Sequence, residues 1–164
     1  MTNEDPVDAQ WNPINIPLLR IRATYPIIVC PTGPGVSIWM HWLPEYKRTM
    51  PCQWGRCPYC SGGIVRRPLC YVPAMVLKSR DGQASWRSMV LELPLRAGLF
   101  CFDHIGQSLS VRRIKPNGPV DLFPVAKFGA PSELRKFDVF KTLFALWRTP
   151  ATMQVALVSS GYTE

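Results

Sequence analysis

The chain has no long hydrophobic run and no sequence that resembles a leader peptide. No stretch of its 164 residues approaches the roughly 18 consecutive apolar residues of a membrane-spanning helix. The first ten residues, MTNEDPVDAQ, lack both the basic and the apolar region of a secretory signal. We therefore expect a cytoplasmic protein that has no membrane partner and keeps its six cysteines reduced.

The chain also lacks the familiar signatures of enzymes. It contains no GxGxxG, P-loop, paired-carboxylate or serine-nucleophile pattern in a supporting context. Only two histidines are present, and one of them, His104, lies in an apolar segment that favours an ordinary, partly buried side chain. Cys30 and Cys101 have apolar neighbours too and are expected to be small core residues. The sequence therefore predicts a protein without catalytic activity.

Residues 41–71 (HWLPEYKRTMPCQWGRCPYCSGGIVRRPLCY) are the most informative part of the chain. Cys57 and Cys60 form a CxxC knuckle, and a pair of thiolates at this spacing can bind one Zn²⁺ at about 2.3 Å. A tetrahedral ion then needs two more nitrogen or sulfur ligands. Cys52 is the obvious third ligand, and His41 and Cys70 compete for the fourth position. We favour His41, because Cys70 begins an apolar segment where a small buried thiol is ordinary.

Three other interpretations of the cysteine cluster were weighed. A disulfide framework needs an oxidising compartment, for which the N-terminal sequence gives no indication. CPYC is the dithiol sequence of glutaredoxins, but Ser61, Gly62 and Gly63 would break the helix that activates such a cysteine. The spacing from His41 onward also differs from the His-x-Glu and Pro-Cys-x-x-Cys pattern of zinc deaminases. A closed structural zinc site fits the spacing better than any of these.

The positive charge is concentrated around the same cysteines. The net charge of the chain is +8, and residues 44–80 contain seven basic residues with Glu45 as the only acid. Aromatic residues alternate with these bases, a combination typical of single-stranded nucleic-acid binding because cations neutralise phosphates and rings stack on bases. The predicted contact residues are Tyr46, Lys47, Arg48, Trp54, Arg56, Tyr59, Arg66, Arg67, Tyr71, Lys78, Arg112 and Arg113.

The content of 17 prolines and 11 glycines favours a β-rich chain with many turns. Residues 94–107 are ambiguous, although Leu95, Leu99, Phe102 and Ile105 could line one face of a helix. A second helix is predicted from Pro131 onward, and Trp39 and Trp42 alternate on a strand of which one face is expected to be core. Strands are predicted at 16–30, with a bend near Pro26, and at 36–43, 70–78, 85–93, 108–115 and 120–128, with a hairpin turn at 79–82.

This order of elements predicts a mainly β fold, an OB-like barrel with an inserted zinc-knuckle module and a C-terminal helix. Barrels of this type commonly bind single strands on one open face. The predicted organisation is a disordered arm at 1–15, an OB-like domain at 16–130 with the zinc module at 44–69, the helix at 131–148 and a tail at 149–164.

The order of a histidine, a cysteine and a CxxC knuckle in a basic, aromatic chain resembles the zinc-containing single-stranded-DNA-binding proteins of T-even phages. It is also similar to uncharacterised bacterial and phage proteins with an HW or HF, PC, CPxC, G and Y pattern and a C-terminal FDV and LW helix. The likeness covers residues 36–148. It implies a structural zinc ion held by His41, Cys52, Cys57 and Cys60, and no active site.

The sequence is therefore interpreted as a zinc-stabilised protein that binds single-stranded nucleic acid, more readily DNA, with little sequence preference. Such a protein would associate with the nucleoid. The first alternative is a zinc-module adaptor that docks on an acidic partner, as a component of a larger nucleoprotein complex. The second is a thiol oxidoreductase that uses Cys57 and Cys60.

Overall fold

A long β-hairpin forms the centre of the protein. The computed structural model describes residues 16–21, 25–53, 55–115 and 118–148. The hairpin consists of β5 (Arg66–Arg80) and β6 (Gln83–Pro94), which pair from Leu69 opposite Pro94 to Arg80 opposite Gln83. Its turn requires two residues with positive φ, and Asp81 and Gly82 supply them at 52° and 76°. The hairpin predicted at 79–82 is confirmed, with longer strands than expected.

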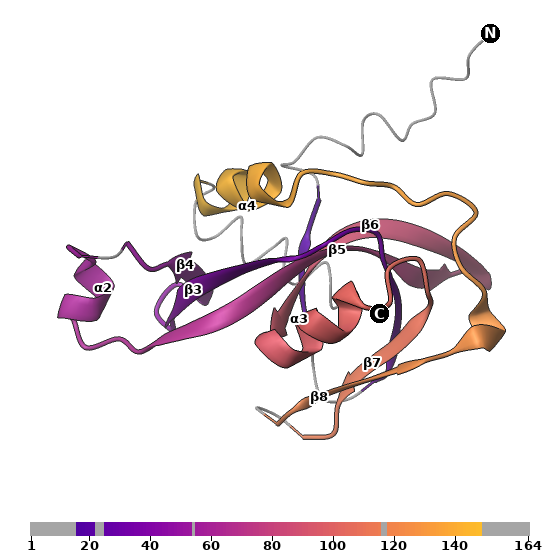
Figure 1. Ribbon diagram of the computed structural model, residues 1–164, viewed down its shortest axis with the longest axis horizontal. Helices are drawn as coiled ribbons and strands as arrows, with labels where there is room; N and C mark the ends of the chain where they lie inside the picture. The colour runs from indigo at the N-terminus through magenta and orange to yellow at the C-terminus, as the bar shows by residue number, and fades with distance from the viewer. Residues whose placement is uncertain (1–15, 22–24, 54, 116–117, 149–164) are drawn as a thin grey trace, which may run out of the picture.

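The other strands extend the sheet from both edges of this hairpin (Figure 1). β1 is parallel to β6, whereas β2 and β3 pair antiparallel with successive halves of β5. Beyond them, β7 and β8 continue from β2, and β4 pairs with β3. These strands are β1 (Leu18–Arg20), β2 (Ile27–Pro31), β3 (Val36–Leu43), β4 (Arg48–Pro51), β7 (Leu109–Arg113) and β8 (Val120–Pro124).

The fold is mainly β, as predicted. The sheet order β1-β6-β5-β2-β7-β8 has β1 and β8 at its ends, and within the described residues these two strands do not pair. The described sheet is therefore not closed, and the predicted barrel is not confirmed.

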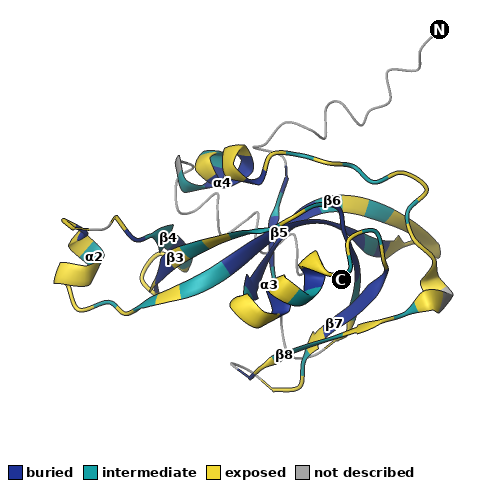
Figure 2. Cartoon of the chain, viewed as in Figure 1, coloured by how far each residue is buried: buried dark blue, intermediate teal, exposed yellow. Residues whose placement is uncertain are grey.

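Both faces of the central hairpin are buried over residues 70–76 and 89–93, whereas most residues near its turn are exposed. Alternate residues of a strand point to opposite sides of the sheet, so each face contributes to a different core cluster. On one face, Val72, Ala74 and Val76 of β5 join a core cluster that also contains Ala97 and Cys101. On the other face, Tyr71 joins a second cluster that includes Leu143 and Leu146. Figure 2 shows the buried hairpin between the two covering helices, α3 on one side and α4 on the other.

Helix α3 (Leu95–Phe102) lies where the sequence was ambiguous, but it turns the opposite face to the core from the one expected. Its buried residues are Ala97, Gly98 and Cys101. A Cβ atom on Gly98 would lie 2.2 Å from Sγ of Cys70, so only glycine permits this close approach. The larger apolar residues proposed for the buried face, Leu95, Leu99, Phe102 and Ile105, are all exposed.

Helix α4 (Val139–Arg148) begins eight residues later than predicted. Residues 131–138 are not helical, so Pro131 does not start the helix. The side chain of Asp138 accepts a hydrogen bond of 3.1 Å from the backbone N–H of Lys141 and so caps the first turn. The predicted arm and tail lie outside the described residues. A short 3₁₀ helix, η2 (Ala126–Phe128), follows β8.

Candidate metal centre

Three successive segments bring four potential metal ligands together at one end of the sheet. His41 lies in β3, between its pairing partners Met50 of β4 and Arg66 of β5. Cys52 follows β4 directly, and its backbone N–H donates to the carbonyl of Trp39 at 2.8 Å. Cys57 directly precedes the single-turn helix α2 (Pro58–Ser61), and Cys60 lies within it. Figure 1 shows α2 at the end of the molecule beyond β3 and β4.

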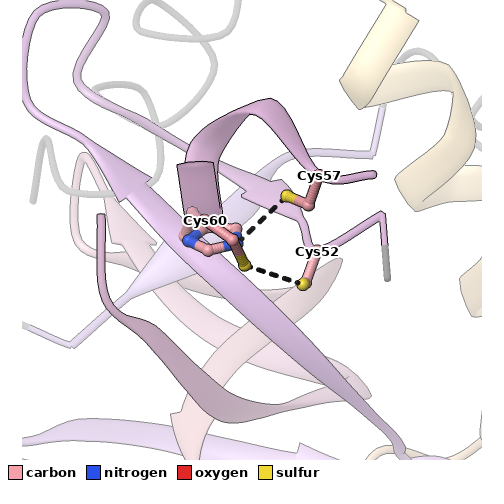
Figure 3. A group of neighbouring side chains, drawn as sticks. Cys52, Cys57 and Cys60 are labelled. Carbon is pink, nitrogen blue, oxygen red and sulfur yellow. Dashed lines mark hydrogen bonds between the residues drawn. The ribbon is translucent and has the colours of Figure 1, made fainter. Parts of the chain in front are cut away.

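The ligand atoms have the spacing expected around a tetrahedral ion. Sγ of Cys52 lies 3.6 Å from Sγ of Cys60, and Nε2 of His41 lies 3.4 Å from Sγ of Cys57 and 3.5 Å from Sγ of Cys60. Corners of a tetrahedron with bonds of about 2.0–2.3 Å stand about 3.3–3.8 Å apart. All four atoms lie within 4.8 Å of one another, and Figure 3 shows the three cysteines converging. The cluster can therefore hold a metal ion.

The knuckle turn favours a thiolate at Cys57. Burial by itself favours the neutral thiol, but backbone N–H groups of Gln53, Cys60 and Tyr59 donate to the sulfur and lower its pKa to about 6. Cys57 is 3% exposed, so hydrogen bonds from these amides replace the hydrogen bonds that water would donate to a surface thiolate. The turn thus prepares Cys57 as an anionic ligand at neutral pH.

The remaining ligands indicate that the cluster needs a cation. Burial, followed by hydrogen bonds and charge from Cys52 and Cys57, raises the pKa of Cys60 to about 11. Burial disfavours the charged ring of His41, but hydrogen bonds and charge from the same two cysteines outweigh it and raise its pKa. Thiolates this close repel one another, and a bound metal ion removes that repulsion.

Cys70, the alternative fourth ligand, lies outside the cluster. It pairs with Ser37 and Leu93 in the middle of the sheet and packs under α3 against Gly98. Burial raises the pKa of its thiol. The choice of His41 over Cys70 therefore agrees with the arrangement of the side chains.

Two predicted nucleic-acid contacts instead surround the metal ligands. Nη1 of Arg66 donates to Sγ of Cys52 at 3.9 Å, and its guanidinium carbon lies 5.2 Å from the centre of the Trp39 ring. The ring of Tyr59 lies 5.5 Å from the ring of His41, at an angle of 53°. Both side chains are half-buried, and each contacts one of the potential metal ligands.

The other predicted contact residues are divided by the fold. Tyr71 is fully buried and Lys78 is 8% exposed, so neither presents its side chain to a ligand on the surface. Both interpretations as contact residues were wrong, because charge and ring counts do not show which strand residues point inward. Trp54 lies outside the described residues. The exposed members are Tyr46, Lys47, Arg56, Arg67 and Arg112, and Arg48 and Arg113 are half-buried.

Three of these basic residues have structural roles or positions away from the metal loop. Nη2 of Arg48 donates to the backbone carbonyl of Trp147 at 2.8 Å, which ties β4 to α4. Arg112 and Arg113 lie in β7, on the other side of the sheet, and Nε of Arg113 donates to the carbonyl of Ile21 at 2.9 Å. The predicted contact set is therefore not one continuous surface.

The sequence interpretation missed a polar cluster on the opposite face of the metal-bearing strands. Oε1 of Glu92 accepts from Nε of Arg20 at 2.9 Å, and Oε2 accepts from Thr49 and Tyr71 at 2.9 Å each. An acid in an otherwise apolar strand, VLELP, was the available signal. Trp42, expected to belong to a partly buried strand, is 45% exposed beside this cluster.

No protein-family model, curated protein or solved structure matches the chain. None of the helices in the described part of the chain has the length and apolar character required to cross a membrane.

Proposed function

We propose that the cluster binds one structural zinc ion through His41, Cys52, Cys57 and Cys60. Three thiolates and one imidazole favour Zn²⁺ over oxygen-preferring metals, and four protein ligands leave no open position for a substrate. Such a site carries a net charge of about −1, from three thiolates and a divalent ion. The guanidinium beside Cys52, which belongs to Arg66, offsets this charge.

Zinc supplies the folding free energy that the knuckle lacks. Helix α2 has no buried residue, and the neighbouring Gln53, Gly55 and Arg56 are exposed. Among the described residues of this loop, the buried side chains are those of Cys52 and Cys57, so little described apolar surface is available to hold it in place. The metal therefore fixes the loop against β3 and β5.

We propose that the protein binds single-stranded nucleic acid, more readily DNA, with little sequence preference and without catalysing a reaction. The observation that carries this proposal is the exposure of Lys47, Arg56 and Arg67 around the metal-held loop, beside the exposed ring of Tyr46. Cations on a fixed loop attract phosphates, and exposed rings offer stacking surfaces that accept any base. Backbone affinity combined with stacking gives binding without a sequence code.

An OB-like arrangement is part of this proposal. β2 pairs with both β5 and β7, and α3 connects β6 to β7. This connectivity is compatible with a partly open five-stranded barrel, a fold that binds single strands across one face. The resemblance to zinc-containing phage single-strand-binding proteins supports the same proposal.

The test is a panel of single- and double-stranded oligonucleotides at two salt concentrations, with zinc-loaded protein. We expect single strands to bind more tightly than duplexes of the same length, and affinity to fall as salt rises because bound counterions are released. A folded, zinc-loaded protein that binds no oligonucleotide at low salt contradicts the proposal.

A second candidate function is that of an adaptor in a nucleoprotein complex. The outer face of α3 and the turn that follows it favour this function, because four apolar side chains there are between 37% and 57% exposed: Leu95, Leu99, Phe102 and Ile105. Adjoining exposed apolar residues on one helix are typical of protein-binding surfaces. A protein partner whose binding is lost in Leu99→Ser, with unchanged oligonucleotide affinity, would support this function.

The dithiol interpretation has less support. A thiol-exchange enzyme needs an accessible cysteine of low pKa. Here Cys57, whose pKa is lowered, is buried, and Cys60, which is exposed, has a raised pKa. A dithiol-exchange assay on zinc-loaded and zinc-free protein tests it.

A further inference from the structure

A cleft of about 590 Å³ lies on the face of β3 opposite the metal ligands. Met40 lines this cleft, whereas its neighbour His41 points to the metal cluster on the other face. The same alternation occurs in β5, where Arg67 lines the cleft and Arg66 contacts Cys52. Alternate strand residues point to opposite faces, so one short sheet separates the two sites.

We propose that this cleft binds one unstacked base of the single strand. This inference rests on the proposed function and adds a defined subsite to it. The volume lies within the range of small-ligand sites, roughly 300–1,000 Å³, and the cleft has the three features that a nucleotide requires. These are an exposed ring for stacking, a polar floor for the base edge and cations for the phosphates.

Trp42 supplies the stacking surface. Its side chain is 45% exposed and lines the cleft, and the guanidinium carbon of Arg20 lies 4.6 Å from the centre of its ring. The guanidinium holds the indole in place through a cation–π contact. A fixed, half-exposed indole loses little conformational freedom when a base stacks on it.

The floor of the cleft offers both a donor and an acceptor. Glu92, which is 9% exposed, accepts hydrogen bonds from Arg20, Thr49 and Tyr71, and a carboxylate has about four lone-pair positions for such bonds. The neighbouring guanidinium of Arg20 is a donor. Every base edge carries donors and acceptors, so this pair can serve any base and agrees with binding of little sequence preference.

The segment that follows the knuckle forms one wall of the cleft. Ile64, Val65 and Arg67 lie on the segment that leads from the knuckle into β5, and all three line the cleft. The backbone N–H of Ile64 donates to the carbonyl of Tyr59 at 3.0 Å, so the wall is attached to the turn between the two knuckle cysteines. Exposed Arg67 stands where the wall meets the sheet and is placed to contact the phosphate of the bound nucleotide.

The chain contains a matched control for Trp42. Trp39 lies on the same strand and is 40% exposed, and its ring also contacts an arginine, Arg66. Its side chain points to the metal face, away from the cleft. Trp42→Leu and Trp39→Leu therefore remove the same chemical group from opposite faces of one strand.

The experiment is a double-mutant cycle between the protein and the strand. Wild type, Trp42→Leu and Trp39→Leu, each checked for zinc content and melting temperature, are titrated with an oligothymidine and with a fully abasic strand of the same length. Against the oligothymidine we expect Trp42→Leu to bind roughly 5- to 150-fold more weakly than wild type, with an almost unchanged salt slope. Against the abasic strand the two proteins should bind alike, because no base remains to stack. Trp39→Leu should behave as wild type with both strands.

The outcomes separate this inference from the proposed function. If wild type binds oligothymidine but Trp42→Leu loses no more affinity than Trp39→Leu, the cleft subsite is wrong and nucleic-acid binding stands. If Trp42→Leu loses the same factor on the abasic strand, Trp42 does not contact a base and the inference is also overturned. If zinc-loaded wild type binds neither strand at low salt, the proposed function itself fails. If Trp42→Leu has a lowered zinc content or melting temperature, Trp42→Phe replaces it. This variant keeps an aromatic ring and should retain most of the affinity if the ring stacks.

Discussion

The hydroxyl of Tyr71 donates a hydrogen bond of 2.9 Å to Oε2 of Glu92, its cross-strand partner in the central hairpin. Burial, with the charge of Glu92 as the next cause, raises the pKa of Tyr71 well above its usual value. Tyr71 is therefore a neutral donor at any physiological pH. It holds in place a carboxylate that would otherwise be buried with only two donors, Arg20 and Thr49.

We predict that Tyr71→Phe destabilises the protein. Loss of a buried hydrogen bond to a charged group costs about 1.5–3 kcal/mol of unfolding free energy. Chemical denaturation of the zinc-loaded protein measures this loss. Tyr46→Phe is the control, because Tyr46 is 55% exposed and an exposed hydroxyl should change stability by less than about 0.5 kcal/mol. Equal stability of Tyr71→Phe and wild type would contradict the hydrogen-bond network.

We predict about one zinc ion per purified chain, retained in Cys70→Ala and lost in His41→Ala. Removing His41 takes away the ligand that ties the knuckle to β3, whereas Cys70 belongs to the core beneath α3. Metal analysis after gel filtration measures the difference. Cys57→Ser and Cys60→Ser should behave as His41→Ala does. Loss of zinc in Cys70→Ala alone would reverse the ligand assignment.

We predict that chelation exposes three of the six cysteines to alkylation. Without a metal the knuckle is no longer held in place, so Cys52, Cys57 and Cys60 become accessible and the surroundings that raise the pKa of Cys60 are lost. Cys30 and Cys101 stay in the core, where burial raises the pKa of Cys30 to about 11 and that of Cys101 to about 12. At pH 8 roughly one in a thousand or fewer of these two thiols is ionised, so they should remain unlabelled, as should Cys70. Mass spectrometry of iodoacetamide-treated protein, with and without chelator, identifies the labelled residues. Labelling of all six after chelation would mean that the knuckle and the main core unfold together.

The same two thiols predict the direction of alkaline destabilisation. In the unfolded chain a thiol ionises near its ordinary pKa of 9.0, whereas Cys30 and Cys101 remain protonated in the folded protein until about pH 11–12. Above pH 9.0 the folded state therefore binds more protons than the unfolded state, and the unfolding free energy falls as pH rises. Cys30→Ala and Cys101→Ala should each lessen the pH dependence of the denaturation midpoint in this range. An unchanged pH dependence in both variants would contradict the effect of burial.

The local chemistry of the sequence was sufficient to predict the central hairpin and a cluster of residues that could hold a metal ion. CPYC and the preceding Cys52 restrict the geometry by themselves, and Asp81-Gly82 specifies its turn through two positive φ values. The fourth ligand was harder to predict, because the choice between His41 and Cys70 depends on which of the two side chains points to the other three cysteines. The close contact between Gly98 and Cys70 decides this, and it depends on the tertiary packing of α3 on β5.

The surface and the helix orientation could not be predicted from composition. Apolar periodicity placed Leu95 and Leu99 in the core, but the smaller Ala97 and Gly98 are buried because α3 lies almost in contact with the sheet. Tyr71 was assigned to the surface because it follows a basic segment, although it lies in a strand that is covered on both faces. Pattern and charge identify candidate residues, whereas their exposure is decided by which layers cover each strand.

The last prediction separates a phosphate contact from a metal contact in two adjacent arginines. Arg67 is exposed at the cleft, so Arg67→Ala should weaken oligonucleotide binding and make the slope of log K against log salt shallower by about 0.7, the value for one lost single-strand phosphate contact. Arg66 contacts Sγ of Cys52, so Arg66→Ala should in addition release zinc at a lower chelator concentration. Binding isotherms at several salt concentrations, together with a chelator titration, measure both effects. Arg112→Ala is the control, because Arg112 is exposed on β7 opposite Asp121 and away from the metal loop, and it should change neither quantity. A salt slope that changes in Arg112→Ala but not in Arg67→Ala would move the nucleic-acid contact from the metal-held loop to the β7–β8 edge.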